Sequence, residues 1–142
     1  MGEPLSGSTI NEPIGRHPKL RTKQMVTDAG KEAITNYKIQ ERMGGYTLLS
    51  VSLETGRTHQ IRVHLAFINY PILGDSVYGG RKKFAAGTSE TVKKELLKFP
   101  RQALHAEKLE FIHPTSGKSV NYSAKTPKDL TQLIDLLQNL NE

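Results

Sequence analysis

Gly44 and Gly45 separate two segments in which apolar and polar residues alternate. In residues 34–42, Ile, Asn, Lys and Gln alternate with Thr, Tyr and Ile, and residues 47–53 place three aliphatic side chains on one face. A Gly-Gly pair between alternating segments is a strong signal for a two-residue β-hairpin, because glycine readily adopts the positive φ angles that such turns require. The sequence therefore predicts strands at 34–42 and 47–53 that pair antiparallel.

The rest of the chain adds further helices and strands around this hairpin. Thr58 is a suitable N-cap for a helix that carries apolar residues at helical spacing and stops at Tyr70-Pro71. Further elements are expected at 89–99 (helix), 103–112 and 118–124 (strands), and a final helix with Thr126 as its cap, Pro127 at its first position and a stripe of Leu130, Leu133, Ile134, Leu137 and Leu140. This order predicts an α+β fold with a mixed, mostly antiparallel sheet and a few flanking helices. Residues 1–13 are expected to be a flexible leader, and residues 14–142 to form the folded part.

The composition narrows the function classes. The chain of 142 residues has no cysteine, which excludes disulfides and thiolate metal sites and suits a reducing cytoplasm. No apolar stretch approaches the roughly 18 residues needed to span a bilayer, so no membrane partner is expected. A net charge of +6 favours a polyanionic partner.

Much of the positive charge lies in two short segments. Residues 16–23 carry Arg16, Lys19, Arg21 and Lys23 without any acidic residue, and Arg81-Lys82-Lys83 form a second cluster. Either segment is explained by a solvated loop or by contacts to nucleic-acid phosphates, which position a nucleic acid without reading its sequence.

The run Leu53–His64 combines residue types that seldom cluster for packing alone. Gly56 permits a sharp end to the strand, Arg57 and Arg62 supply guanidinium groups, and His59 and Gln60 fall in the expected first turn of the helix. Such an element can hold an anion and orient a carboxylate, but it supplies no nucleophile.

Structural roles are equally open for these residues. His59 and His64 could be buried, hydrogen-bonded histidines, and Arg62 could form a structural ion pair. A zinc site is disfavoured, because the histidine spacing is i, i+5 and no HExxH glutamate is present. Asp75 lies among glycine and proline residues, which favours an Asx-type turn over a catalytic role. The residues alone therefore reveal no convincing catalytic acid.

The run Leu53–His64 resembles the signature of RluA/RluD-type pseudouridine synthases. Five further segments match that family in the same order along the chain. Two lie before this run, at residues 12–18 and 30–35, and three lie after it, at residues 71–80, 101–106 and 113–117. The resemblance covers roughly residues 10–140. It implies a cytoplasmic isomerase that converts uridine to pseudouridine in ribosomal or transfer RNA, without metal or cofactor, on an α+β catalytic domain. The target base would be flipped out of the RNA.

The resemblance assigns Arg62 as the active-site arginine that pairs with a catalytic aspartate. Arg57, His59 and Gln60 would support the pocket or the RNA, together with the basic residues Arg16, Lys19, Arg21 and Lys23. The family's HRLD-type motif, which carries that aspartate, does not occur in this sequence, and neither does the strand with the catalytic tyrosine.

The chain thus resembles the C-terminal portion of a catalytic domain and is expected to be inactive alone. Its expected partners are RNA and the upstream half of that domain, with self-association through an exposed sheet edge as a further expectation. The alternatives are a non-catalytic RNA-binding module and a structural half-domain.

Overall fold

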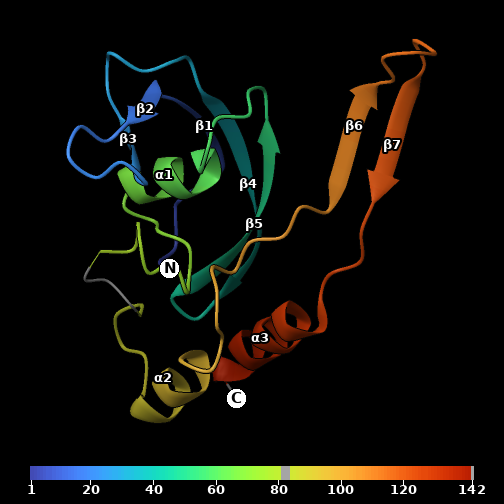
Figure 1. Ribbon diagram of the computed structural model, residues 1–142. Coiled ribbons are helices and arrows are strands. Elements are labelled where there is room, and N and C mark those ends of the chain that lie inside the picture. Colours follow the sequence, from blue (N-terminus) through green and yellow to red (C-terminus); the bar gives the residue numbers. More distant parts are fainter. Residues whose placement is uncertain (81–83, 142) are drawn as a thin grey trace.

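The computed structural model describes residues 1–80 and 84–141 (Figure 1). Its strands are β1 (Ser8–Asn11), β2 (Ile14–Arg16), β3 (Gln24–Val26), β4 (Ile34–Met43), β5 (Tyr46–Leu53), β6 (Lys108–Ile112) and β7 (Ser119–Ser123). Its helices are α1 (Gln60–Phe67), α2 (Glu90–Leu96) and α3 (Lys128–Gln138), followed by a 3₁₀ turn at Asn139–Asn141. The predicted α+β fold is confirmed, with the described strands arranged as three separate antiparallel sheets. Among these residues no helix is long and apolar enough to cross a membrane.

The predicted hairpin is the centre of the largest sheet, whose strand order is β1-β4-β5. Gly44 and Gly45 have φ angles of 55° and 87°, so the turn uses the backbone region that glycine favours. Met43 pairs with Tyr46 across it, and the register shifts once, between Ile39 and Glu41. Both predicted strands are confirmed to within one residue at each end.

The prediction of a flexible leader at residues 1–13 needs correction. Residues 8–11 form β1 and pair antiparallel with residues 34–37 of β4. Ile10 is buried in a cluster with Tyr37, Leu65 and Ile72, and Arg42 Nη2 donates hydrogen bonds to the carbonyl oxygens of Pro4 and Leu5. A single apolar residue in a polar segment gives no periodic signal, so only the available edge of β4 reveals this strand.

Helix α3 closes the largest apolar cluster. Leu130, Leu133 and Leu137 are buried there, and Ile134 and Leu140 pack against it partly buried, which confirms the predicted stripe. The predicted start is one residue early, because Pro127 occupies the cap position and no side chain caps the helix. Helix α2 is shorter than the predicted 89–99, and the Ser89 hydroxyl accepts a hydrogen bond from the Val92 N–H at its start.

A cavity of about 120 Å³ lies between β5, α1 and α3. Its lining is mostly apolar and includes Leu48, Val51, Leu65, Leu133 and Leu137. None of the polar side chains of the Leu53–His64 junction lines this cavity.

The β6–β7 hairpin projects from the rest of the chain (Figure 1). The expected strand at 103–112 is shortened to residues 108–112, because residues 103–107 form the link that carries the hairpin away from the body. The second strand covers 119–123, within the predicted 118–124.

Candidate active site

Helix α1 begins at Gln60, two residues after the predicted cap at Thr58. His59 occupies the cap position with φ 56°, a left-handed conformation that is uncommon outside glycine but that asparagine, aspartate and histidine adopt more often than other residues. His59 and Gln60 consequently point in different directions from the junction. The Gln60 side chain hydrogen-bonds to β4, whereas the His59 ring lies beside Tyr78.

Gln60 holds the junction against the sheet. Its side-chain Oε1 accepts hydrogen bonds from the Arg57 N–H at 2.9 Å and the Thr55 hydroxyl at 2.8 Å. Its Nε2 donates to the Ile34 carbonyl and to the Thr35 hydroxyl, both at 3.0 Å. Two donors and two acceptor positions are the full capacity of an amide. Gln60, which was predicted to support the pocket or the RNA, is therefore buried and fully engaged within the chain.

His64 is a structural histidine, one of the alternatives left open by its sequence context. Its ring is fully buried, with Nδ1 at 2.8 Å from the Thr35 hydroxyl and Nε2 at 2.8 Å from the Glu12 carbonyl. A carbonyl only accepts, so Nε2 donates. A neutral ring then accepts at Nδ1 from Thr35, whose oxygen accepts in turn from Gln60. The network connects α1 to β4 without an unsatisfied group.

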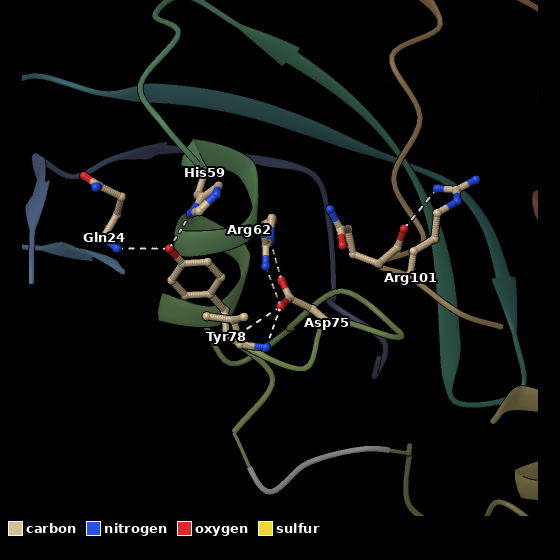
Figure 2. Close-up of polar contacts among 8 residues, drawn as sticks. Gln24, His59, Arg62, Asp75, Tyr78 and Arg101 are labelled. Atoms are coloured by element: carbon tan, nitrogen blue, oxygen red, sulfur yellow. Dashed lines mark hydrogen bonds and ion pairs between the residues drawn. The ribbon is translucent and has the colours of Figure 1, made fainter. Parts of the chain in front are cut away.

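Arg62 forms a bidentate ion pair with Asp75 (Figure 2). Arg62 Nε donates to Asp75 Oδ2 at 2.9 Å and Nη2 donates to Oδ1 at 3.0 Å. The Asp75 side chain is 1% exposed and that of Arg62 is 13% exposed. Asp75 Oδ1 also accepts from the Val77 and Tyr78 N–H groups, both at 3.0 Å, so the expected Asx-type turn is present.

The expected partner of Arg62 was an aspartate outside this chain. Within the described residues Arg62 pairs with Asp75, through the edge of the guanidinium formed by Nε and Nη2. Arg62 Nη1 makes no hydrogen bond within the described residues. Because a guanidinium has two edges suited to carboxylates, pairing with Asp75 leaves a second edge for another acceptor.

The ion pair shifts the pKa of both groups. Burial raises the pKa of Asp75, but the hydrogen bonds from Arg62 and from the Tyr78 and Val77 N–H groups outweigh it, so the net pKa lies below the ordinary value. The hydrogen bond to Asp75 raises the pKa of Arg62 against the opposing effect of burial. Both groups are therefore held in their charged forms.

Tyr78 is a functional candidate that the sequence patterns did not single out. The Arg62 guanidinium carbon lies 4.8 Å from the centre of the Tyr78 ring, a distance suited to a cation–π contact. The Tyr78 hydroxyl accepts from the Gln24 N–H at 3.0 Å and lies 2.7 Å from His59 Nδ1 (Figure 2). Tyr78 follows Asp75 by three residues, and the turn at Asp75 was the signal that could have indicated it.

Tyr78 also brings the basic loop of residues 16–23 close to the Arg62 site. Lys23 Nζ lies 5.6 Å from the centre of the Tyr78 ring. Arg16 is the last residue of β2, Lys19 and Arg21 lie on the loop between β2 and β3, and all three are exposed. The second predicted basic cluster, residues 81–83, lies outside the described residues.

Arg57 lies at the same junction with part of its charge already engaged. Its side-chain Nε donates to the Glu32 carbonyl at 2.8 Å, and the side chain remains half-buried.

Among residues 1–80 and 84–141, no group of three His, Cys, Asp or Glu side chains could hold a metal ion.

The fold has counterparts among solved structures. Two solved human structures share it, with sequence identities too low to show more than the fold. RNA pseudouridylate synthase domain containing 1 has a TM-score of 0.69 at 22% identity over 97% of this chain and 62% of its own. RNA pseudouridylate synthase domain containing 4 has a TM-score of 0.67 at 22% identity, over 94% and 57%.

The family follows from the sequence. Residues 2–67 match the family described as RNA pseudouridylate synthase. The ribosomal large subunit pseudouridine synthase D of Xanthomonas campestris is 49% identical over 138 residues, covering 97% of this chain and 42% of the relative. That of Pseudomonas aeruginosa is 47% identical over 142 residues, covering 100% and 44%. The chain belongs to the RluA/RluD-type pseudouridine synthase family, and it spans under half the length of these relatives.

Proposed function

We propose that this chain supplies one side of an active site, the side that contains Arg62. This active site isomerises uridine to pseudouridine in ribosomal or transfer RNA. The proposal is carried by the Arg62–Asp75 pair, in which one edge of a guanidinium is fixed and the other is left for a second carboxylate. Family membership supports the reaction, and the relatives are named for pseudouridine synthesis in the large ribosomal subunit.

The second carboxylate would be the aspartate of the HRLD-type motif, supplied by polypeptide outside this chain. A fixed guanidinium beside a carboxylate lowers its pKa and holds it in the charged form, which is the form that acts as a nucleophile. Asp75 and the Tyr78 ring would restrict the directions in which Arg62 can point, so that the incoming aspartate meets a prearranged donor. Since the reaction rearranges atoms within one nucleotide, the proposal requires neither a metal nor a cofactor.

Activity is expected only when this chain is joined to the polypeptide that supplies the aspartate of the HRLD-type motif. The test replaces the matching portion of the Pseudomonas aeruginosa relative with this chain, since the two align over all 142 residues. The chimera is expected to form pseudouridine in unmodified ribosomal or transfer RNA, whereas the isolated chain forms none. Arg62→Lys in the chimera should lower the rate at least about 100-fold, because lysine cannot reproduce bidentate pairing. Mapping pseudouridine in the RNA measures each rate.

Arg42→Lys is the matched control for this test. Arg42 donates to two carbonyl oxygens near the start of the chain and takes no part in the Arg62 site, so the activity should be retained. Product formed by the isolated chain would contradict the half-site, and equal activities of the two lysine variants would contradict the role of Arg62.

RNA binding by the isolated chain is expected to depend on the loop of residues 16–23. Replacing Lys19, Arg21 and Lys23 together with alanine should weaken RNA affinity. It should also reduce the slope of log affinity against log salt by about 2–3, because each phosphate contact releases about one counterion. Filter binding at several salt concentrations measures this slope.

The control replaces three lysines of equal total charge on and beside α2, Lys93, Lys94 and Lys98. Two of these already pair with glutamates of the same segment. A slope lowered equally by both triple variants would show that only net charge matters. Salt-dependent binding together with an inactive, folded chimera would favour the alternative of a non-catalytic RNA-binding module.

A further inference from the structure

The β6–β7 hairpin has one apolar face that is open to solvent. In the antiparallel register Leu109 pairs with Tyr122 and Phe111 with Val120, and these four side chains share one face. Leu109 is 58% exposed, Tyr122 60% and Phe111 39%. The Phe111 and Tyr122 rings stack on each other with their centres 6.1 Å apart. The face is thus a continuous apolar surface.

The opposite face of the hairpin is mostly polar. It carries Lys108, Glu110, Ser119, Asn121 and Ser123 and a single large apolar residue, Ile112. This alternation is typical of strands with one buried face and one solvated face. Every residue of β6, and every residue of β7 except Val120, is nevertheless exposed.

A two-stranded hairpin is at best marginally stable in water, and a third strand or a packed layer is needed to stabilise it. Figure 1 shows the hairpin extending from the body between the links that join it to α2 and α3. Neither sheet face is covered there, and the outer backbone edge of β6 has no strand partner within the described residues. The pattern of its residues therefore indicates a contact that the described part of this chain does not supply.

We propose that the face of Leu109, Phe111, Val120 and Tyr122 docks the polypeptide that the relatives carry beyond the portion matched by this chain. The curated relatives and the solved neighbours all contain such polypeptide: this chain covers 42–44% of the former and 57–62% of the latter. The hairpin lies inside the matched portion, since the match to Pseudomonas aeruginosa covers the whole chain. This proposal depends on the proposed function only for the identity of that polypeptide.

The chemistry of the face favours protein over RNA. Leu109 and Val120 offer aliphatic surface, and the two aromatic rings already stack on each other. The hairpin strands carry one lysine and one glutamate, unlike the cationic loop of residues 16–23. An apolar strand or helix from another part of the fold complements such a surface, whereas a phosphate backbone does not.

The test compares two serine variants in two settings. Phe111→Ser alters the apolar face, and Ile112→Ser alters the opposite face at the neighbouring position, where the side chain is 66% exposed. Each variant is made in the isolated chain and in the chimera with the Pseudomonas aeruginosa relative. In the chimera, Phe111→Ser is expected to lower the melting temperature by about 5 °C or more, because the ring is buried there, and Ile112→Ser by less than about 2 °C. In the isolated chain both variants should melt within about 1 °C of the parent.

Hydrogen exchange gives a second measurement without any variant. The amides of β6 are expected to exchange at least about 10-fold more slowly in the chimera than in the isolated chain, because docking buries them. Equal exchange in both settings, or equal melting shifts for the two variants in the chimera, would overturn the proposal.

The same variants distinguish two other possible occupants of this face, a second copy of the chain and RNA. Dimers of the isolated chain in light scattering that Phe111→Ser abolishes would assign the face to a second copy and overturn the proposal. If Phe111→Ser lowers the RNA affinity without shifting the melting temperature of the chimera, the apolar face binds RNA and the proposal is overturned. Because melting is read independently of turnover, an inactive chimera with the expected melting shifts would refute the proposed function and leave the docking surface supported.

Discussion

Replacing Asp75 with alanine is expected to destabilise the folded chain by about 3–5 kcal/mol. The substitution leaves the Arg62 guanidinium without its bidentate partner in a site where its side chain is 13% exposed. It also removes the acceptor of the Val77 and Tyr78 N–H groups, so the turn loses its hydrogen bonds. Asp75→Asn should cost less, because its oxygen can still accept from the turn. Urea unfolding followed by far-ultraviolet circular dichroism measures the free energies of unfolding.

The control for Asp75 is Asp129→Asn. Asp129 also forms a bidentate pair, with Arg101, but both side chains are substantially exposed. Solvent screens such a pair, so its loss should have a much smaller effect. Equal losses for Asp75→Asn and Asp129→Asn would contradict the view that burial makes the Arg62–Asp75 pair important.

The stabilising effect of Asp75 is also expected to depend on pH. Its folded-state pKa lies below the ordinary value, so folding favours the charged carboxylate. The resulting stability is present above pH about 4 and is lost as the pH falls through the folded-state pKa. The difference in unfolding free energy between the parent and Asp75→Asn should therefore shrink below pH about 4. A difference that grows on acidification would contradict the assignment.

Replacing Gln60 with leucine is expected to destabilise the chain by about 3–4 kcal/mol, since each buried polar group left unsatisfied costs roughly 1–3 kcal/mol and some regain water. Leucine nearly conserves the volume, so the loss reflects the four hydrogen bonds of the amide rather than a cavity. Because these bonds connect the start of α1 to β4, circular dichroism should also show reduced helix content before the main unfolding transition.

Gln138→Leu provides the matched control for Gln60. The Gln138 amide donates to the Glu41 carboxylate at the surface, so its loss should change stability by no more than about 0.5 kcal/mol. If Gln60→Leu were equally mild, the junction would be held by the backbone alone and the proposed role of its amide would be wrong.

Local patterns predicted most of the elements of this fold. The Gly44-Gly45 turn, the strands on either side of it and the apolar stripe of α3 all arise from residues close in sequence, where backbone preference and periodicity act directly. The start of α1 was predicted one residue too early, because the cap position is occupied by His59 in a left-handed conformation rather than by Thr58. Strand β1 was missed, because its only local signal is one isoleucine and its partner residues on β4 are 23 or more positions away in the sequence.

The candidate site divides in the same way. The motif singled out Arg62, whose catalytic role stays a prediction. Gln60 was expected to support the pocket or the RNA, and its amide makes four hydrogen bonds within the chain. Asp75 was correctly placed in an Asx-type turn, yet nothing local indicated that the same carboxylate also pairs with Arg62. Tyr78 was overlooked, because its importance lies in contacts with Gln24, His59 and Arg62 from two other elements.

The amino-acid sequence by itself determined the class of fold, the main hairpin, the helices and a guanidinium suited to pairing with a carboxylate. These depend on residue chemistry and on spacings of a few residues. Only the tertiary structure decided that Arg62 points at Asp75, that Tyr78 joins this pair to the basic loop, and that the apolar face of the β6–β7 hairpin remains open. Each of those contacts depends on how separate elements pack, and the direction of a side chain across such an interface is set by the elements on both sides.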